Sequence, residues 1–247
     1  MRRPEQVGLK VVPQGLLMAM LRPPAGRDTE FNHWYDLEHA PYRNSVPGFL
    51  TARRWRMVPG WNGIGTLDPD KAAAESAEPM HYMAIYDLDK VEVLDGTEYL
   101  NWRNTASQTE WEMLAALSAN DRRVYQPISL PALAHGDDLE ICGPYMMAGW
   151  WEIDEEHRPK FEEWYLQEHL PLLMQVPGTR RIRRFERIDE VAPGRYLALH
   201  DVESLDVFDH PLTAEAASTP WRSKATHYRS GFTTRLYKLW RRFDDPS

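Results

Sequence analysis

The sequence has little cysteine, no long apolar run and no excess of positive charge. Cys142 is the only cysteine, so the chain can form no internal disulfide and no zinc site built from protein thiolates alone. No apolar run approaches the roughly 20 residues of a membrane-spanning helix, and the first residues do not lead into a signal peptide. The formal net charge is −8, whereas nucleic-acid-binding proteins usually present a basic face. We therefore expect a cytoplasmic protein that binds neither membranes nor nucleic acids.

The sequence also lacks the patterns of common cofactor and metal sites. No glycine-rich loop of the phosphate-binding kind precedes a predicted helix. No two histidines are spaced as His-x-His or His-x-x-x-His, and His33 and His39 diverge on a helix because they are six residues apart. A long-range metal site from Glu38, His39 and His81 is the remaining alternative. We expect no cofactor and no metal.

The sequence contains one internal repeat. Residues 31–54 and 161–184 align at a constant offset of 130, and eleven of the 24 positions are identical. Both copies contain Trp-Tyr-x-x-Glu-His-x-Pro, then Val-Pro-Gly, then Arg-Arg. Repeats of this kind are sought before any fold is named. We interpret the pattern as an internal duplication, with residues 14–130 and 144–243 as two domains of one type.

The order of predicted elements is the same in both halves. In the first half the elements are an apolar strand over 15–21, a helix from Asp28 or Thr29 that ends or kinks at Pro41, strands over 49–58 and 81–87, a helix containing Trp102 and a closing strand over 124–130. The second half restarts with a strand over 145–153 and closes over 232–243. This order predicts an α+β fold of two ferredoxin-like halves. Their antiparallel sheets are expected to pack face to face within the chain.

The repeated motif resembles the EthD-like branch of the dimeric α+β barrel superfamily, over both halves of the chain. The resemblance implies a small-molecule protein, because that superfamily includes polyketide cyclases, cofactor-free monooxygenases of phenolic rings, isomerases and haem enzymes such as the chlorite dismutases. The EthD-like motif does not suit the haem branch. In several relatives the ligand lies between the sheet and its helices within one half, where a histidine of the first helix can meet the substrate.

The repeated histidines His39 and His169 are the main catalytic candidates. Histidine exchanges protons near neutral pH, and a position at a helix end before Pro41 or Pro171 favours the imidazolium through the helix dipole. The alternative is a structural role, in which each histidine pins its helix to the Val-Pro-Gly turn. Tyr86 and the aligned His200 are the candidate second polar groups of each half.

Further candidates concern binding of the substrate. Arg53 and Arg183 are candidates to steady an anion. The rings of Trp34, Tyr35 and Tyr82 are candidates to line a cavity, although aromatic residues at helical spacing usually pack the core. Glu38 and Glu168 are expected to pair with an indole N–H or an arginine. The matched Asp87 and Asp201 are expected to make turns at the ends of their strands.

The first copy carries an insertion of about 16 residues between Pro59 and Pro79, which contains Trp61. Such a loop can be a lid over a site, although plain surface packing of Trp61 fits the sequence equally. The lid interpretation favours the first copy as the principal site.

The function we expect is cofactor-independent proton transfer on a small hydrophobic molecule, leading to cyclisation, isomerisation, elimination or ring oxygenation. The alternative is a non-catalytic ligand-binding protein. A homodimer of the two-repeat chain is left open.

Overall fold

The computed structural model describes residues 12–77, 82–133, 142–189 and 193–243. The predicted strand residue His81 and the end of the insertion at Pro79 lie outside these ranges. We call residues 12–133 the first half and residues 142–243 the second half.

The first half has four long strands and two groups of outer helices. Its strands are β1 (Gly15–Arg22), β2 (Phe49–Met57), β3 (Tyr82–Leu88) and β4 (Ala119–Pro127), followed by the short β5 (Ala132–Leu133). Its helices are α1 (Asp28–Trp34), α2 (Ala40–Asn44), α3 (Pro69–Ala77), α4 (Thr97–Asn104) and α5 (Gln108–Ala116), with a π-helical turn over Tyr35–His39 and a 3-10 turn over Val91–Asp95. The insertion therefore contains a helix, α3, that the sequence analysis did not predict.

The second half repeats this order. Its strands are β6 (Tyr145–Ile153), β7 (Thr179–Arg187), β8 (Tyr196–Val202) and β9 (Arg229–Arg242). Its helices are α6 (Arg158–Trp164), α7 (Leu170–Met174), α8 (Asp206–Asp209), α9 (Pro211–Ser218) and α10 (Pro220–Ala225), with a π-helical turn over Tyr165–His169 and a 3-10 turn over Thr226–Tyr228. No helix among the described residues is long and apolar enough to cross a membrane.

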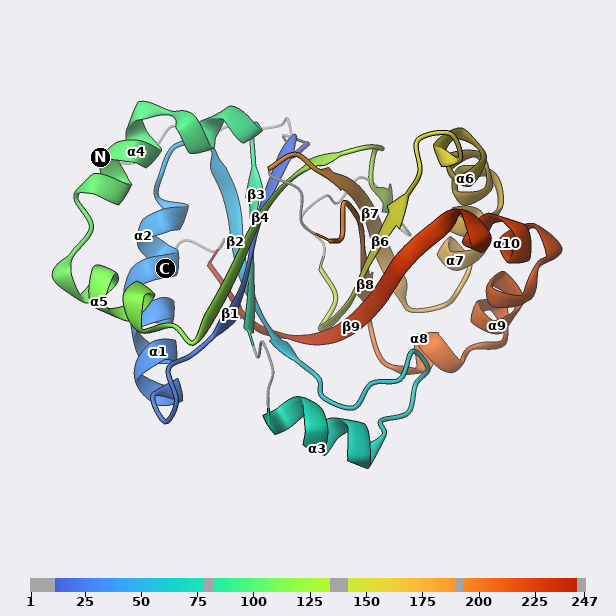
Figure 1. Ribbon diagram of the computed structural model, residues 1–247, viewed down its shortest axis with the longest axis horizontal. Coiled ribbons are helices and arrows are strands. Elements are labelled where there is room, and N and C mark those ends of the chain that lie inside the picture. Colours follow the sequence, from blue (N-terminus) through green and yellow to red (C-terminus); the bar gives the residue numbers. More distant parts are fainter. Residues whose placement is uncertain (1–11, 78–81, 134–141, 190–192, 244–247) are drawn as a thin grey trace.

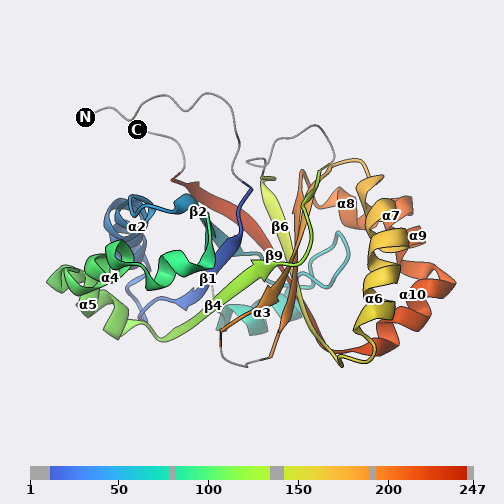
Figure 2. The same ribbon diagram turned by 90° about the horizontal axis from the view of Figure 1, so that it is seen from above.

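The strands form one closed antiparallel sheet, so the sheets of the two halves, which were expected to pack face to face as a fused α+β barrel, are also joined at their edges. The order is β4-β1-β3-β2-β9-β6-β8-β7, β4 pairs with β7 to close an eight-stranded barrel, and β5 adds to β7. Figures 1 and 2 show the helices of the two halves on opposite outer sides of this barrel, except for α3, which lies below the barrel in Figure 1. The halves therefore meet edge to edge as well as face to face, because joining the edges pairs backbone groups that two separate sheets would leave open.

The interior of the barrel is an apolar core shared by both halves. Buried side chains from each half belong to one cluster, which includes Met18, Met83, Met146, Trp150 and Leu197. Separate clusters lie on the outer faces, between each four-stranded portion of the sheet and its own helices. The predicted contact between the inner sheet faces is thus present, within a closed sheet.

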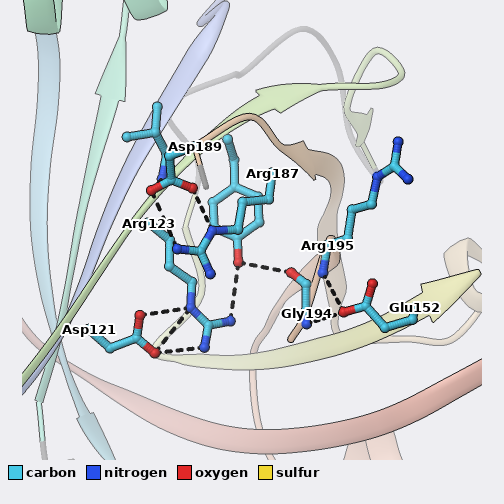
Figure 3. A network of polar contacts seen from close by, with 9 residues as sticks. Asp121, Arg123, Glu152, Arg187, Asp189, Gly194 and Arg195 are labelled. Atoms are coloured by element: carbon cyan, nitrogen blue, oxygen red, sulfur yellow. Dashed lines mark hydrogen bonds and ion pairs between the residues drawn. The ribbon is translucent and has the colours of Figure 1, made fainter. Parts of the chain in front are cut away.

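A polar network holds the closing seam between β4 and β7 (Figure 3). Arg123 Nη2 donates to Asp121 at 2.7 Å, and the hydroxyl of Tyr125 donates to the carbonyl of Gly194 at 3.3 Å. Asp189 accepts from Arg187 Nε at 2.5 Å and from the backbone N–H of Val124 at 3.0 Å. The bonds of Tyr125 to Gly194 and of Val124 to Asp189 join β4 to the second half, and the N–H of Ile188 donates to the carbonyl of Val124 at 3.0 Å, so the seam fixes residues 188 and 189 against the first half.

The two Val-Pro-Gly segments form the predicted turns. The N–H of Phe49 donates to the carbonyl of Val46, and that of Thr179 to the carbonyl of Val176, both at 3.1 Å. Gly48 has φ +93° and Gly178 has φ +89°. This combination is a type II turn, which requires a positive φ at its third residue.

Candidate functional site

A large cavity lies in the first half, between the helices and the outer face of the sheet. Its volume is about 710 Å³. Aromatic and apolar side chains form much of its wall, including Tyr35, Tyr99, Trp102, Trp111 and Leu114. Ionisable groups also line it, including His39, Arg43, Glu92, Glu110 and Arg122, and Ile188 and Asp189 reach it from the second half. The cavity can therefore hold a small molecule that has both apolar surface and polar atoms.

His39 is the candidate catalytic residue that lines this cavity. It is only 2% exposed, and its Nδ1 lies 2.6 Å from Glu110 Oε1. The ring packs against Trp34, Tyr35 and Trp102 at centroid distances of 4.8, 4.5 and 5.9 Å. An ionised Glu110 can only accept, so it selects the tautomer that carries its proton on Nδ1. Nε2 then holds the lone pair.

A π-helical turn sets the position of His39. The N–H of Ala40 donates to the carbonyl of Tyr35, five residues earlier. Pro41 has no N–H and its ring would clash with the carbonyl four residues before it in a regular helix. The wider turn lets the helix continue as α2 through Pro41, so Pro41 does not end the helix. The same arrangement recurs before Pro171, where the N–H of Leu170 donates to Tyr165.

Glu110 was not predicted as a site residue. It lies in the first turn of α5, whose N-cap Ser107 accepts from the N–H of Glu110 at 3.1 Å. Ser-x-x-Glu is a capping-box pattern, so the sequence signal indicated a helix start only. The side chain instead reaches His39 and is 6% exposed. Only the packing of α5 beside α2 brings the two residues together.

Burial, followed by the positive charge of Arg43, lowers the pKa of His39 to about 4, although Glu110 acts in the opposite direction. The expectation of an imidazolium stabilised by a helix end is therefore wrong, because the helix continues past His39 as α2 and the ring is buried beside a cation. His39 is neutral at pH 7, which is the form that can accept a proton.

Tyr35 and Tyr86 form a buried pair at the cavity wall. Their hydroxyls are 3.0 Å apart, and burial raises the pKa of both. Tyr35 lines the cavity, whereas Tyr86 supports it from β3. Arg54 lies over the Tyr35 ring at 4.3 Å and is paired with Asp36. Both tyrosines remain protonated at pH 7 and can act as hydrogen-bond donors.

Arg43 is a second cavity residue that the sequence analysis missed. It is 9% exposed, and its guanidinium carbon lies 4.6 Å from the Trp102 ring and 5.2 Å from the Tyr86 ring. Its Nε is buried and has no hydrogen-bond partner among the described residues. The aligned residue of the second copy is Leu173. A comparison of the two copies at this position could have drawn attention to Arg43.

The histidine of the second half has different surroundings. His169 Nδ1 is buried without a hydrogen-bond partner among the described residues. Burial lowers the pKa of His169 to about 3, with His200 as the next cause, and burial lowers the pKa of His200 to about 4. The structure thus brings His169 and His200 near each other, and no described carboxylate bonds His169 as Glu110 bonds His39.

The two repeated glutamates also differ. Glu168 accepts from the indole N–H of Trp164 at 3.0 Å and from the hydroxyl of Thr219 at 2.5 Å, as a pairing with an indole had suggested. Glu38 is exposed. Asp36 takes the buried position instead, where it accepts from Arg54 and, at 3.0 Å, from the indole N–H of Trp240.

Arg53 and Arg183 lie on the inner side of the sheet, away from the cavity. Arg53 Nη1 is 3.1 Å and Arg183 Nη1 is 2.7 Å from the carboxylate of Asp87, and Arg181 Nε is 2.8 Å from Asp201. The prediction that these aspartates make turns was wrong, because both are buried within their strands and paired with arginine. The cluster joins the two halves.

The described part of the insertion, residues 59–77, contacts the second half and does not line the cavity. Trp61 is 4% exposed and packs on Phe208 with ring centroids 5.1 Å apart. The N–H of Gly65 donates to Asp209 at 2.8 Å. Figure 1 shows the loop that leads to α3 reaching α8. The insertion therefore does not cover His39.

The remaining predicted residues, Trp34 and Tyr82, are buried and lie outside the cavity wall. The Tyr82 hydroxyl accepts from Asn32 at 2.9 Å. Within the four described ranges, no group of three or more histidine, cysteine, aspartate or glutamate side chains is arranged to hold a metal ion.

Comparisons with known proteins show the fold. No family model matches the sequence, and no curated protein matches it. An anthrone oxidase-like protein superposes with a TM-score of 0.59 at 10% identity, covering 94% of this chain and 92% of the other. A proposed monooxygenase from Fusobacterium nucleatum gives 0.59 at 8% identity and 95% of both chains. A mutant chlorite dismutase from Candidatus Nitrospira defluvii gives 0.57 at 11% identity, covering 92% and 90%. The shared fold is that of the dimeric α+β barrel proteins.

Proposed function

We propose that the protein is a cofactor-independent enzyme that uses His39 as a general base on a small, hydrophobic, aromatic or polyketide-like molecule. The observation that carries this proposal is the His39–Glu110 hydrogen bond at the wall of a ring-lined cavity. Glu110 orients the imidazole and leaves Nε2 as the basic nitrogen, as in other carboxylate–histidine pairs. A neutral His39 at pH 7 is ready for this role.

The proposed step is proton abstraction from an acidic C–H or O–H bond of the substrate. Nε2 of His39 takes the proton, and the electron pair stays on the substrate as an enolate or phenolate. Cyclisation, isomerisation, elimination and ring oxygenation can all begin with such an anion. The names of structural neighbours, an anthrone oxidase-like protein and a proposed monooxygenase, belong to those proteins and are compatible with this step.

Anthrone is a suitable probe for this step. Loss of a proton from its C10 carbon gives an aromatic oxyanion, so exchange of that proton needs a base and no oxidant. We expect the protein to accelerate exchange of the C10 protons for deuterium under nitrogen in D₂O, measured by NMR, and His39→Ala to lose most of that acceleration. A protein that binds anthrone without any acceleration over buffer would support the ligand-binding alternative.

We also propose that the chain is a tandem duplication of an EthD-like domain, each copy folded as a ferredoxin-like unit. Two observations support this origin. The strands follow the orders β4-β1-β3-β2 and β9-β6-β8-β7, which are the same order within each half. Both copies of Trp-Tyr-x-x-Glu-His-x-Pro also form the same π-helical turn. A cytoplasmic location stays a prediction from the sequence.

A further inference from the structure

Among the arginines that line the cavity, Arg43 has a distinct environment. Arg103 and Arg122 are exposed, whereas Arg43 is 9% exposed. Burying a cation is costly unless a partner compensates it. Every other buried arginine discussed above is bonded to a carboxylate, but the side chain of Arg43 makes no ion pair or hydrogen bond to any residue that the structure describes.

The packing of Arg43 fixes the direction in which it can bind. Its guanidinium lies against the rings of Trp102 and Tyr86, so those rings hold it through cation–π contacts. A guanidinium carries its N–H donors in its plane, and ring contacts leave these donors available. Since Arg43 lines the cavity, a ligand oxygen there can accept from it.

The charges around Arg43 favour a negatively charged ligand. The aromatic groups Tyr35, Tyr86 and Tyr99 surround it, and burial keeps Tyr35 and Tyr86 protonated by raising their pKa. Glu110 is the one carboxylate that acts on it among its principal neighbours, and Glu110 is already bonded to His39. An anionic oxygen of the ligand would supply the missing partner.

We propose that Arg43 binds the oxygen anion of an acidic aromatic substrate, so that the site takes phenols and enolisable ketones as their phenolates or enolates. This inference rests on the proposed function and deepens it. His39 Nε2 takes the proton, the electron pair moves to the substrate oxygen, and Arg43 donates to that oxygen. The bond is stronger with the oxyanion than with the neutral oxygen, so it lowers the barrier to proton removal.

The probe for this inference is 4-nitrophenol, whose phenolate absorbs visible light, so the ionisation of the bound molecule can be titrated. We expect the wild-type protein to bind the phenolate about 10-fold more tightly than Arg43→Leu does, which corresponds to a difference of about one unit in the pKa of the bound phenol. Arg43→Leu copies the residue of the second half. Arg43→Lys should keep part of the preference, because it retains the charge but loses the planar donors.

The matched control is Arg56→Leu, at an exposed position of β2 outside the cavity, which should leave the phenolate preference unchanged. Circular dichroism of each variant checks that the fold is intact. An unchanged preference in Arg43→Leu, or no phenolate binding by the wild type, would overturn the inference. Failure of the proposed base is a separate result: His39→Ala would then exchange anthrone protons like the wild type, whatever Arg43 does to phenolate binding.

Discussion

The two halves build the same helix from the same motif but surround its histidine differently. His39 bonds Glu110 and lies near Arg43, whereas His169 Nδ1 has no hydrogen-bond partner among the described residues, lies near His200 and has Leu173 at the position of Arg43. The π-helical turn and the stacked Trp-Tyr-His rings recur in both halves. The repeated motif therefore supplies the scaffold, and residues outside the motif decide which histidine has the partners of a general base.

The arginine that follows the motif illustrates the same point. Arg54 lies over Tyr35 at 4.3 Å and Arg184 over Tyr165 at 4.0 Å, so the stacking is retained. The carboxylate partner has moved, from Asp36 in the first half to Glu162 in the second. The arginine over the tyrosine ring is thus retained in both halves, whereas its carboxylate partner comes from a different turn of the helix in each half.

The largest effect should come from removing each histidine in turn. His39→Ala should slow the proposed proton exchange about 100-fold, because a general base contributes roughly 100-fold or more. His169→Ala should slow it less than twofold. The measurement is the rate of deuterium incorporation into anthrone. Equal losses from both variants would show two working sites, and a large loss from His169→Ala alone would reverse the assignment.

Acid should lower the stability of the protein because the second half buries neutral histidines. Burial lowers the pKa of His200 to about 4 in the folded state, against about 6.5 in an unfolded chain. The unfolded state therefore binds more protons between pH 6.5 and 4, so this contribution is fully present above pH 6.5 and is lost as the pH falls toward 4. One such group lowers the free energy of unfolding by about 2 kcal/mol between pH 7 and pH 5.

His200→Gln should reduce that acid loss by about 2 kcal/mol, measured by urea unfolding at pH 7 and pH 5. Comparing the difference between the two pH values cancels any general cost of the substitution. His33→Gln, at an exposed position of α1, is the control and should lose as much stability in acid as the wild type. The same loss in His200→Gln would mean that this imidazole is not buried as a neutral group.

Replacing Glu110 should leave the Nδ1 of His39 without a carboxylate partner, as in His169. Glu110→Gln keeps the size of the side chain but removes the carboxylate that selects the Nδ1–H tautomer. We expect about 10-fold slower exchange, as for other carboxylates that orient a histidine, with little change in the affinity for 4-nitrophenol. Glu112→Gln, on an exposed part of α5, is the matched control. If Glu110→Gln exchanges anthrone protons at the wild-type rate, the Glu110 carboxylate has no role in the action of His39.

The two turn glycines should give the smallest difference. Gly48→Val and Gly178→Val both force a β-branched residue to a positive φ, which costs about 1 kcal/mol or more. A Cβ at Gly48 would lie 2.4 Å from Val93 Cγ2, whereas one at Gly178 would lie 2.8 Å from Val207 Cγ2. Gly48→Val should therefore lower the urea midpoint more.

Gly26→Ala measures the backbone cost of a positive φ separately from the cost of a steric contact. Gly26 has φ +73° with no atom within 4 Å of an added Cβ, so it reports the backbone cost without a contact. A loss at Gly48→Val no larger than at Gly26→Ala would show that Val93 moves aside easily.

The sequence by itself determined the repeated elements of this protein. The motif Trp-Tyr-x-x-Glu-His-x-Pro, the alternation of apolar residues and the Val-Pro-Gly turns act over a few neighbouring residues, so the α+β fold and the type II turns at Gly48 and Gly178 could be predicted from local rules. The same rules indicated His39 and Tyr35 as residues of interest, since both lie in the repeat.

Only the tertiary structure decided how those elements meet. Joining β2 to β9 and β4 to β7 closes the sheet, which places Arg53 and Arg183 against Asp87 inside it and carries Trp61 to the second half. Glu110 reaches His39 across 71 positions of the chain. Such contacts depend on packing between distant segments, and a capping-box glutamate or an arginine after a proline gives no local sign of them. The partners of His39 were therefore set by the fold and could not be read from the motif that contains it.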